Sequence, residues 1–248
     1  MRYLFEITYE GTHYHGWQTQ TNAIGIQQVV EETLCKLIRE PISIVGSGRT
    51  DTGVHCVQQF FHVDIDKVFD KDNLIIRLNS FLPKDIAIRS VRKVKPEASA
   101  RYDAFERTYE YHITLKKDPL RAGLTFYFFK PINLSTLRQA TALLRGSHDF
   151  ECFSKVKTDV NHFICDVKNA GWNKKGDLLV FSITANRFLR GMVRAIVGTL
   201  LEVGTEKISV EDFRSILKSK DRKKAGMNVP PEGLYLMRVK YPKSIFVK

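Results

Sequence analysis

The residues from Gly46 to His55 are those best suited to chemistry in this chain. One carboxylate, Asp51, and one guanidinium, Arg49, stand among three glycines between two apolar runs. Glycines gather where the backbone turns sharply or approaches a ligand closely. The alternative is an ordinary turn, because Asp and Gly are the commonest turn residues. The stretch lacks the glycine pattern of a dinucleotide-binding loop and the Gly-Lys-Ser/Thr of a Walker loop, so a different chemistry must need Asp51.

Three arginines form a second candidate set in the C-terminal half. Arg187, Arg190 and Arg194 recur at i, i+3 and i+7 in a stretch with strong apolar helical periodicity, which predicts that they line one helix face. A solvated basic face is the alternative interpretation. An arginine near the buried side of such a helix needs a carboxylate partner to offset its desolvation. Asp51 is a candidate for that partner.

Two tyrosines form the third candidate set. The sequence Arg107-Thr108-Tyr109-Glu110-Tyr111 places Tyr109 and Tyr111 on one face of a predicted strand. Tyrosine in a strand usually serves packing. On a face that borders a cleft, a phenol can also stack on a nucleobase and exchange a proton.

The charge of the chain favours a polyanionic partner. Among 248 residues, 39 Lys and Arg outnumber 27 Asp and Glu, which gives a net charge of +12 and a pI near 9.5. Nucleic acid is the first candidate partner and an anionic membrane surface is the second. No stretch approaches the roughly 20 apolar residues of a membrane span, and the first residues lack the apolar core of a signal peptide. We therefore expect a soluble cytoplasmic protein without a membrane partner.

The four cysteines do not indicate a metal site or a disulfide. No Cys-x-x-Cys pair is present, and a chain of this length does not need disulfides for stability. His148, Cys152, His162 and Cys165 do not have the spacing of a usual zinc site. We expect reduced thiols and no bound metal.

Hydrophobic periodicity predicts the elements that position the candidate residues. In the first half we expect strands at 3–9, 42–47, 56–63 and 86–94 and helices at 25–39 and 71–82. In the second half we expect strands at 109–115, 163–172, 178–185 and 234–241 and helices at 134–145, from 188 to 201 and from about Ser209. Both halves then read βαββαβ, apart from the inserted helix at Ser209.

This repeated order predicts an α+β fold of two ferredoxin-like domains whose sheets join around a central basic cleft. We expect an N-terminal domain at 1–100 with the Asp51 loop and a C-terminal domain at 101–248 with the tyrosine strand and arginine helix. Such folds often present a sheet face to RNA, although the fold alone proves no function. The aromatic string of a simple RNA-recognition module is absent from both halves.

The sequence resembles a known family, the tRNA pseudouridine synthases of the TruA type. Gly48-Arg49-Thr50-Asp51-Thr52-Gly53-Val54-His55 is similar to the family signature Gly-Arg-Thr-Asp-Ala-Gly-Val-His, with Thr52 in place of alanine. The resemblance continues through five further segments: 9–18, 78–86, 100–109, 188–198 and 231–236. One departure is Ala98, at a position where the family has an aromatic residue.

The resemblance implies an isomerase that forms pseudouridine at positions 38, 39 and 40 of the tRNA anticodon stem-loop. It implies that Asp51 is the nucleophile, that Arg194 pairs with Asp51, that Tyr109 lies against the target base and that Arg49 displaces or holds the flipped uridine. Arg101, Arg107 and Arg190 are the further substrate-binding residues that we expect. The reaction needs no cofactor, and the resemblance also implies a homodimer. Attack on C1′ of the ribose and attack on C6 of the uracil both remain open.

Two other functions are compatible with parts of the sequence. A catalytically silent RNA-binding protein or RNA chaperone explains the net charge but leaves Asp51 without a purpose. An enzyme that acts on a small molecule explains Asp51 but not the charge of +12. Binding that weakens steeply with added salt distinguishes the RNA functions from this last one.

Overall fold

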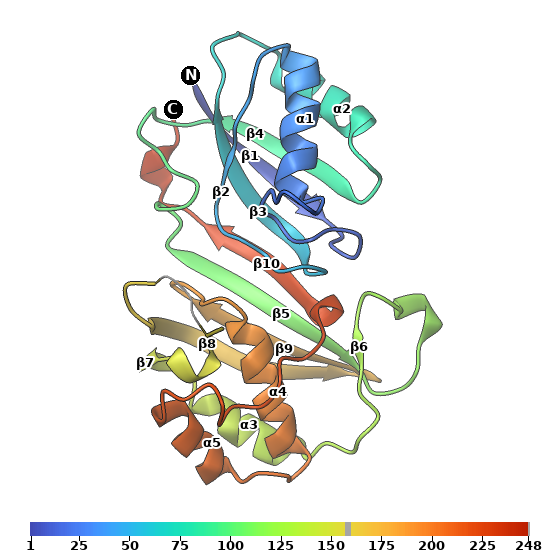
Figure 1. Ribbon diagram of the computed structural model, residues 1–248, viewed down its shortest axis with the longest axis vertical. Helices are drawn as coiled ribbons and strands as arrows, with labels where there is room; N and C mark the ends of the chain where they lie inside the picture. The colour runs from blue at the N-terminus through green and yellow to red at the C-terminus, as the bar shows by residue number, and fades with distance from the viewer. Residues whose placement is uncertain (157–159, 248) are drawn as a thin grey trace. The chain divides into compact units, whose positions relative to one another are not determined.

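A computed structural model of the protein describes residues 1–156 and 160–247 (Figure 1). Helices and strands are mixed, which confirms the predicted α+β class. The chain divides into two compact units, the first formed by Met1–Glu106 with Leu236–Lys248 and the second by Arg107–Tyr235. The ferredoxin-like layout, the domain bounds 1–100 and 101–248 and the central basic cleft stay predictions.

The first unit is built on a sheet in which β1 is a central strand. Its elements are β1 (Arg2–Tyr9), α1 (Ile26–Ile38), β2 (Val45–Gly46), β3 (His55–Asp64), α2 (Lys71–Phe81), β4 (Ile86–Lys93), β10 (Leu234–Lys240) and the 3-10 helix η4 (Lys243–Ile245). The strand order is β4-β1-β3-β10, with the short β2 on β3. β1 runs antiparallel to β3 and to β4, so residues from three distant parts of the sequence share one sheet.

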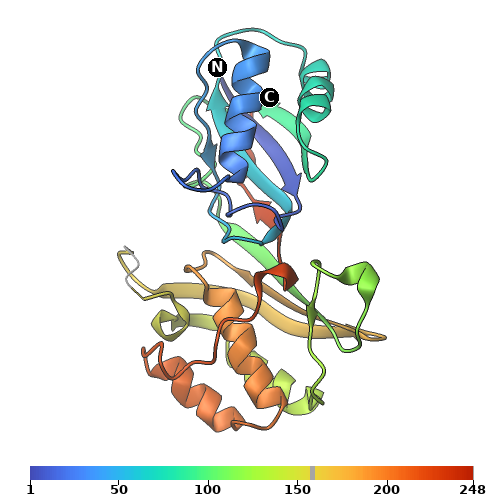
Figure 2. The same ribbon diagram turned by 45° about the vertical axis from the view of Figure 1, so that its right-hand side comes forward.

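The two helices of the first unit form where apolar residues recur with helical spacing. In α1, Ile26, Val30 and Leu34 recur every four residues and are fully buried. α2 begins after Asp70, whose carboxylate accepts a hydrogen bond from the backbone N–H of Asn73 and so caps the helix. α1 and α2 lie side by side (Figure 2), and α2 also packs on β4.

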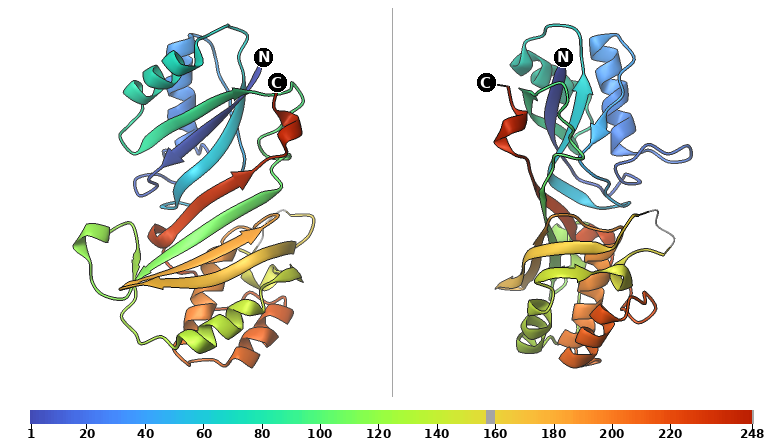
Figure 3. Two further views of the ribbon diagram at one scale, coloured as in Figure 1. Left: turned by 180° about the vertical axis from the view of Figure 1, so that it is seen from behind. Right: turned by 90° about the vertical axis from the view of Figure 1, so that its left-hand side faces the viewer.

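The second unit combines a sheet with three helices that pack on one another, and α3 also packs on β8 (Figure 3, left). Its elements are β5 (Glu106–Thr114), β6 (Phe126–Tyr127), α3 (Leu134–Ala142), β7 (Gly146–Asp149), β8 (Ile164–Lys175), β9 (Leu178–Ala185), α4 (Met192–Gly204) and α5 (Val210–Lys218). Its 3-10 helices are η1 (Pro119–Arg121), η2 (Glu151–Phe153) and η3 (Pro231–Gly233). The strand order is β5-β9-β8-β7, and the short β6 lies parallel to β5.

Every predicted helix and strand overlaps an observed element, and three differences are larger than a few residues at an end or concern a strand that was not predicted. The strand expected at 42–47 is reduced to the two residues of β2. The short strands β6 and β7 have no counterpart among the predictions, because two to four residues are too few for a periodic pattern. Ser209 begins α5 as expected and forms a capping box with Asp212.

The third difference concerns the helix that carries the candidate arginines. It was expected from residue 188, but α4 begins at Met192, after Gly191 in the left-handed conformation with φ +74°. Leu189 precedes the helix and is nevertheless buried, so the apolar pattern extends beyond the helical backbone. The expectation that Arg187, Arg190 and Arg194 line one helix face is therefore wrong, because only Arg194 lies within α4.

Candidate active site

The loop between β2 and β3 carries Asp51 in the first unit. The Asp51 residue is half-buried, whereas Thr50 before it is buried and Thr52 after it is exposed. The backbone N–H of Val54 donates a hydrogen bond to the carbonyl of Asp51 at 3.2 Å, which closes a tight turn. The turn thus holds the backbone of Asp51 at the edge between interior and solvent.

A second loop, residues 11–18, packs against the Asp51 loop. The backbone N–H of Trp17 donates to the carbonyl of Thr50 at 3.2 Å, and that of Gly53 donates to the carbonyl of Tyr14 at 3.2 Å. Trp17 is buried and packs its ring against Tyr9 and Phe61. The family motif of residues 9–18 therefore supports the Asp51 loop from one side.

A buried chain of hydrogen bonds supports the same loop from β1 and β3. The Tyr9 hydroxyl donates to Oε1 of Gln59 at 2.8 Å and lies 2.8 Å from the Thr50 hydroxyl. A phenol has one hydrogen, so the Thr50 hydroxyl donates to Tyr9. Nε2 of Gln59 then donates to the carbonyl of Gly48 at 3.0 Å. The residues on both sides of Arg49 are thereby fixed by the sheet.

His55 and Arg49 make the other polar contacts of this loop. Nδ1 of the buried His55 accepts a hydrogen bond from the backbone N–H of Gly11 at 3.1 Å, so this nitrogen carries no proton. Arg49 is exposed, and its Nε donates to Oε1 of Gln18 at 3.1 Å. A guanidinium in this position is accessible to an anionic ligand.

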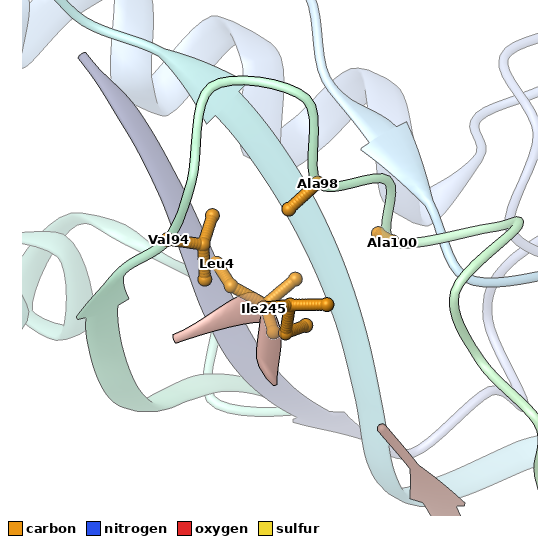
Figure 4. Close-up of a cluster of buried hydrophobic side chains, with 5 residues drawn as sticks. All are labelled: Leu4, Val94, Ala98, Ala100 and Ile245. Carbon is orange, nitrogen blue, oxygen red and sulfur yellow. The ribbon is translucent and has the colours of Figure 1, made fainter. Parts of the chain in front are cut away.

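Arg101 lies in another loop of the first unit, after β4. It is exposed, and its guanidinium lies 5.5 Å from the centre of the Tyr102 ring. The preceding residues are anchored in a small apolar cluster of Leu4, Val94, Ala98, Ala100 and Ile245 (Figure 4). Ala98 and Ile245 of η4 are thus members of the same buried cluster.

Hydrogen bonds add to this anchoring of the Arg101 loop. Nδ1 of His62 accepts from the backbone N–H of Ala100 at 3.0 Å, and the hydroxyl of Tyr241 donates to the carbonyl of Ala100 at 2.5 Å. Arg2 donates to the carbonyl of Ala98 at 2.9 Å. Burial, together with the nearby Arg2 guanidinium, lowers the pKa of His62.

Tyr109 and Arg107 lie on β5 in the second unit, at alternate positions of one strand. Both are half-buried, and they pair with Ile183 and Ala185 of β9. The rings of Tyr109 and Phe188 make an edge-to-face contact, with their centres 4.9 Å apart and an angle of 81° between their planes. Arg107 donates from Nη1 to the carbonyl of Asn186 at 3.0 Å. β9 and the residues after it therefore orient both side chains.

Tyr111 has a structural role, unlike the half-buried Tyr109. It is fully buried, and its hydroxyl donates to the carbonyl of Pro230 at 2.7 Å. Burial raises its pKa well above the ordinary value; the Glu232 carboxylate raises it further, whereas Arg194 opposes the shift. A phenol in this position does not exchange a proton with a substrate.

The candidate arginines of the second unit surround the start of α4. Arg190 is exposed just before the helix, and its carbonyl accepts from the backbone N–H of Lys155 at 2.9 Å. Arg194 is half-buried in the first turn of the helix, and its Nε donates to the carbonyl of Val229 at 2.7 Å. Arg187 contacts His162 through Nη1, at 3.1 Å from Nε2.

The structure thus distributes the predicted residues over two places. Asp51, Arg49 and Arg101 belong to the first unit, whereas Tyr109, Arg107, Arg190 and Arg194 belong to the second. The pairing of Asp51 with Arg194 stays a prediction.

Three supporting residues were missing from the predicted site: Gln18, Gln59 and Phe188. Gln18 and Phe188 both lie in segments that carry the family resemblance, so the sequence offered a signal for them. No motif includes Gln59.

The described residues give two further findings. Among residues 1–156 and 160–247, no group of three or more His, Cys, Asp or Glu side chains is arranged to hold a metal ion. In the same part of the chain, no helix has the length and apolar character required to cross a bilayer.

Comparison with known proteins relates this chain to a family over nearly its full length. A protein of Porphyromonas gingivalis named tRNA pseudouridine synthase A is 46% identical over 250 residues, which cover 99% of each chain. Proteins of the same name from Parabacteroides distasonis and Bacteroides fragilis are 45% and 44% identical, over 99% of this chain and 98% of theirs.

A family model agrees with these relatives. The model, described as tRNA pseudouridine synthase, matches residues 7–103 and 140–242, a range that includes Asp51 and Arg194. These matches confirm the resemblance stated from the sequence motifs. The chain therefore belongs to the tRNA pseudouridine synthase family of isomerases.

Proposed function

We propose that this isomerase converts uridine to pseudouridine at positions 38, 39 and 40 of the tRNA anticodon stem-loop, with Asp51 as its nucleophile. Family membership supports the reaction. The observation that carries the role of Asp51 is its loop, in which hydrogen bonds from β1, β3 and residues 11–18 hold the chain on both sides of this half-buried residue. Such support is typical of a group that must be held in a fixed position for catalysis.

The proposed reaction rearranges one nucleoside without a change of formula. The bond between N1 and C1′ breaks, the uracil rotates, and a bond forms between C5 and C1′. C5 loses its proton and N1 gains one, so no oxidant, reductant or second substrate is consumed. A nucleophile and an acid–base group therefore suffice, and both types of group are present among the candidate residues.

In this proposal Asp51 attacks a carbon of the target nucleotide, either C1′ or C6, and forms a covalent intermediate. A carboxylate is a nucleophile only when it is ionised, and a neighbouring guanidinium favours that form. Arg194 is the proposed partner. Its Nε is already hydrogen-bonded to Val229, so its terminal nitrogens are the ones that would face a carboxylate.

Tyr109 is the proposed group that lies against the base and removes the C5 proton. Its edge-to-face contact with Phe188 fixes the orientation of the Tyr109 ring, against which the base would lie. The target must leave its stack to reach such a group. Arg49, which is exposed and held by Gln18, is proposed to displace or hold the flipped uridine.

The remaining arginines are proposed to bind the phosphates of the stem-loop. Arg101 and Arg190 are exposed and Arg107 is half-buried, and a net charge of +12 suits a polyanionic substrate. Homodimerisation and a cytoplasmic location complete the proposal, as expected for an enzyme of tRNA processing.

Tritium release from tRNA labelled at C5 of uridine tests both the reaction and its position. Three transcripts should be prepared, each with uridine at only one of positions 38, 39 and 40 in the stem-loop. We expect release from each transcript, because isomerisation replaces the C5–H bond, and none from a transcript without uridine at these positions. Release only from uridines elsewhere would contradict the proposed position. Tight, salt-sensitive binding without release would favour the silent RNA-binding function.

A further inference from the structure

Arg222 makes an unusual number of contacts for a residue in a basic surface run. It is half-buried, while the neighbouring Lys223 and Lys224 are exposed. Its Nη1 donates to the carbonyls of Ala225 at 3.2 Å and Gly226 at 3.0 Å, and its Nη2 donates to Oδ1 of Asn228 at 2.9 Å. One guanidinium thus binds three acceptors in the segment 225–229.

Segment 225–229 lies along the first two turns of α4. The backbone N–H of Gly226 donates to the hydroxyl of Thr199 at 2.9 Å. The Met227 carbonyl approaches Gly198 so closely that any side chain there would collide with it. Asn228 lies beside Gly191, where an added Cβ would be 3.3 Å from its amide nitrogen. The segment therefore follows one face of the helix from Thr199 back towards Gly191.

Arg194 lies on the same helix face, one turn before Gly198. It is bound to the segment twice, because its Nε donates to the Val229 carbonyl at 2.7 Å and its own carbonyl accepts from the Val229 N–H at 3.3 Å. The side chain of Arg194 is therefore fixed relative to the segment as well as to the helix. Its orientation depends on where residue 229 is held.

The turn that carries Arg222 is itself fixed. The carboxylate of Asp221 accepts from the backbone N–H of Lys223 at 2.9 Å, and its carbonyl accepts from the N–H of Lys224 at 3.2 Å. The Asp221 N–H donates to the hydroxyl of Ser219 at 3.2 Å, at the end of α5. Arg222 thus links a fixed turn to the segment that binds Arg194.

We propose that Arg222 is a positioning residue for the isomerisation: it holds segment 225–229 in place and thereby fixes the Nε hydrogen bond that orients the Arg194 guanidinium. Lysine cannot replace it, because one ammonium point on a flexible stem does not span three acceptors as the planar guanidinium does. The expected effect on turnover rests on the proposed function, in particular on the role of Arg194. The claim that Arg222 positions Arg194 does not depend on any activity.

The first readout is hydrogen exchange at Nε of Arg194, measured by NMR on the full chain with nitrogen-15 arginine. The signal is identified by its loss in Arg194→Lys. We expect exchange to be at least about tenfold faster in Arg222→Lys than in wild type, because the hydrogen bond opens more often. Lys223→Gln is the matched control, since it removes a charge from the same turn, and it should leave this exchange rate unchanged.

The second readout is turnover of labelled tRNA. We expect Arg222→Lys to lower kcat about tenfold or more and to change KM less than about threefold, because positioning matters to the chemical step. The same substitution in an Arg194→Lys background should add little. Thermal unfolding must show that the variants remain folded. If Arg222→Lys does not fold, Asn228→Ala replaces it in both measurements, because it removes one acceptor of Arg222 without a change of charge.

Unchanged Arg194 exchange in Arg222→Lys would overturn the inference whatever the activity. Faster exchange with an unchanged kcat would overturn its catalytic half. A wild-type protein that releases no tritium would refute the proposed function instead, while the exchange measurement would still decide whether Arg222 positions Arg194.

Discussion

Gly16 and Thr50 are in such close contact that the first residue has no room for a side chain. A Cβ at Gly16 would collide with the Thr50 carbonyl, which is also the acceptor for the Trp17 N–H. Gly16 has a φ of +84°, a conformation that strains any other residue. The contact joins the loop of residues 11–18 to the residue before Asp51.

Gly16→Ala should therefore destabilise the protein by about 2–4 kcal/mol, through strain and displacement of the Thr50 carbonyl. Urea unfolding measures this change. Gly48→Ala is the control in the Asp51 loop, because a Cβ there meets nothing within 4 Å, and it should cost less than about 1 kcal/mol. Equal stability of the two variants would show that the contact does not hold the loop.

Tyr9→Phe should affect both stability and turnover. The change removes the hydroxyl between Thr50 and Gln59 and leaves their buried polar groups without this partner, at a cost of about 1–3 kcal/mol. Because Thr50 adjoins Asp51, we also expect kcat to fall while KM changes little. Tyr3→Phe is a control at another buried position of β1. An unchanged kcat in Tyr9→Phe would separate this network from catalysis.

Tyr109→Phe tests the hydroxyl of Tyr109 without removing its ring. The edge contact with Phe188 should persist, so the variant should keep the packing of the ring and remain folded. If the phenol removes the C5 proton, turnover should fall by about 10²–10⁴-fold. Near wild-type turnover would instead limit Tyr109 to packing against the base.

Acid should weaken the first unit through His62. Burial and Arg2 lower its pKa below the ordinary 6.5, so the unfolded chain takes up a proton at a higher pH than the folded protein does. This contribution to the free energy of unfolding is present above pH 6.5 and is lost as the pH falls through the lowered pKa. Urea unfolding at several pH values measures the loss.

His62→Asn is the control for this pH dependence. An amide oxygen can accept the Ala100 N–H in place of Nδ1 and does not titrate, so the variant should lose less stability between pH 7 and pH 5. The same loss in both proteins would assign the effect to other groups.

The elements of this fold were largely predictable from sequence, whereas their contacts were not. β1 and α1 follow from alternation and from helical spacing, and both match the structure. The start of α4 was predicted too early, because the buried Leu189 extends the apolar pattern to residues before Gly191, where the helix has not yet begun. Periodicity reports which side chains are buried and not where the backbone hydrogen bonds begin.

The candidate site shows the same limit. Motif similarity marks Asp51, Arg49, Tyr109 and Arg194 as candidates, and their roles stay predictions. The supports of the loop depend on side chains that meet only in the fold, such as Gln59, which lies on β3 and reaches the Gly48 carbonyl. Pairings between residues far apart in sequence require the sheet register, which a single sequence does not contain.

Tritium release by Asp51→Ala on tRNA labelled at C5 of uridine is the most direct test of Asp51 as the nucleophile. Thr52→Ala is the matched control, because it changes the exposed neighbour of Asp51 in the same loop. We predict no release by Asp51→Ala, tRNA affinity within about tenfold of wild type, and full release by Thr52→Ala. Substantial release by Asp51→Ala would contradict the assignment of Asp51 as the nucleophile.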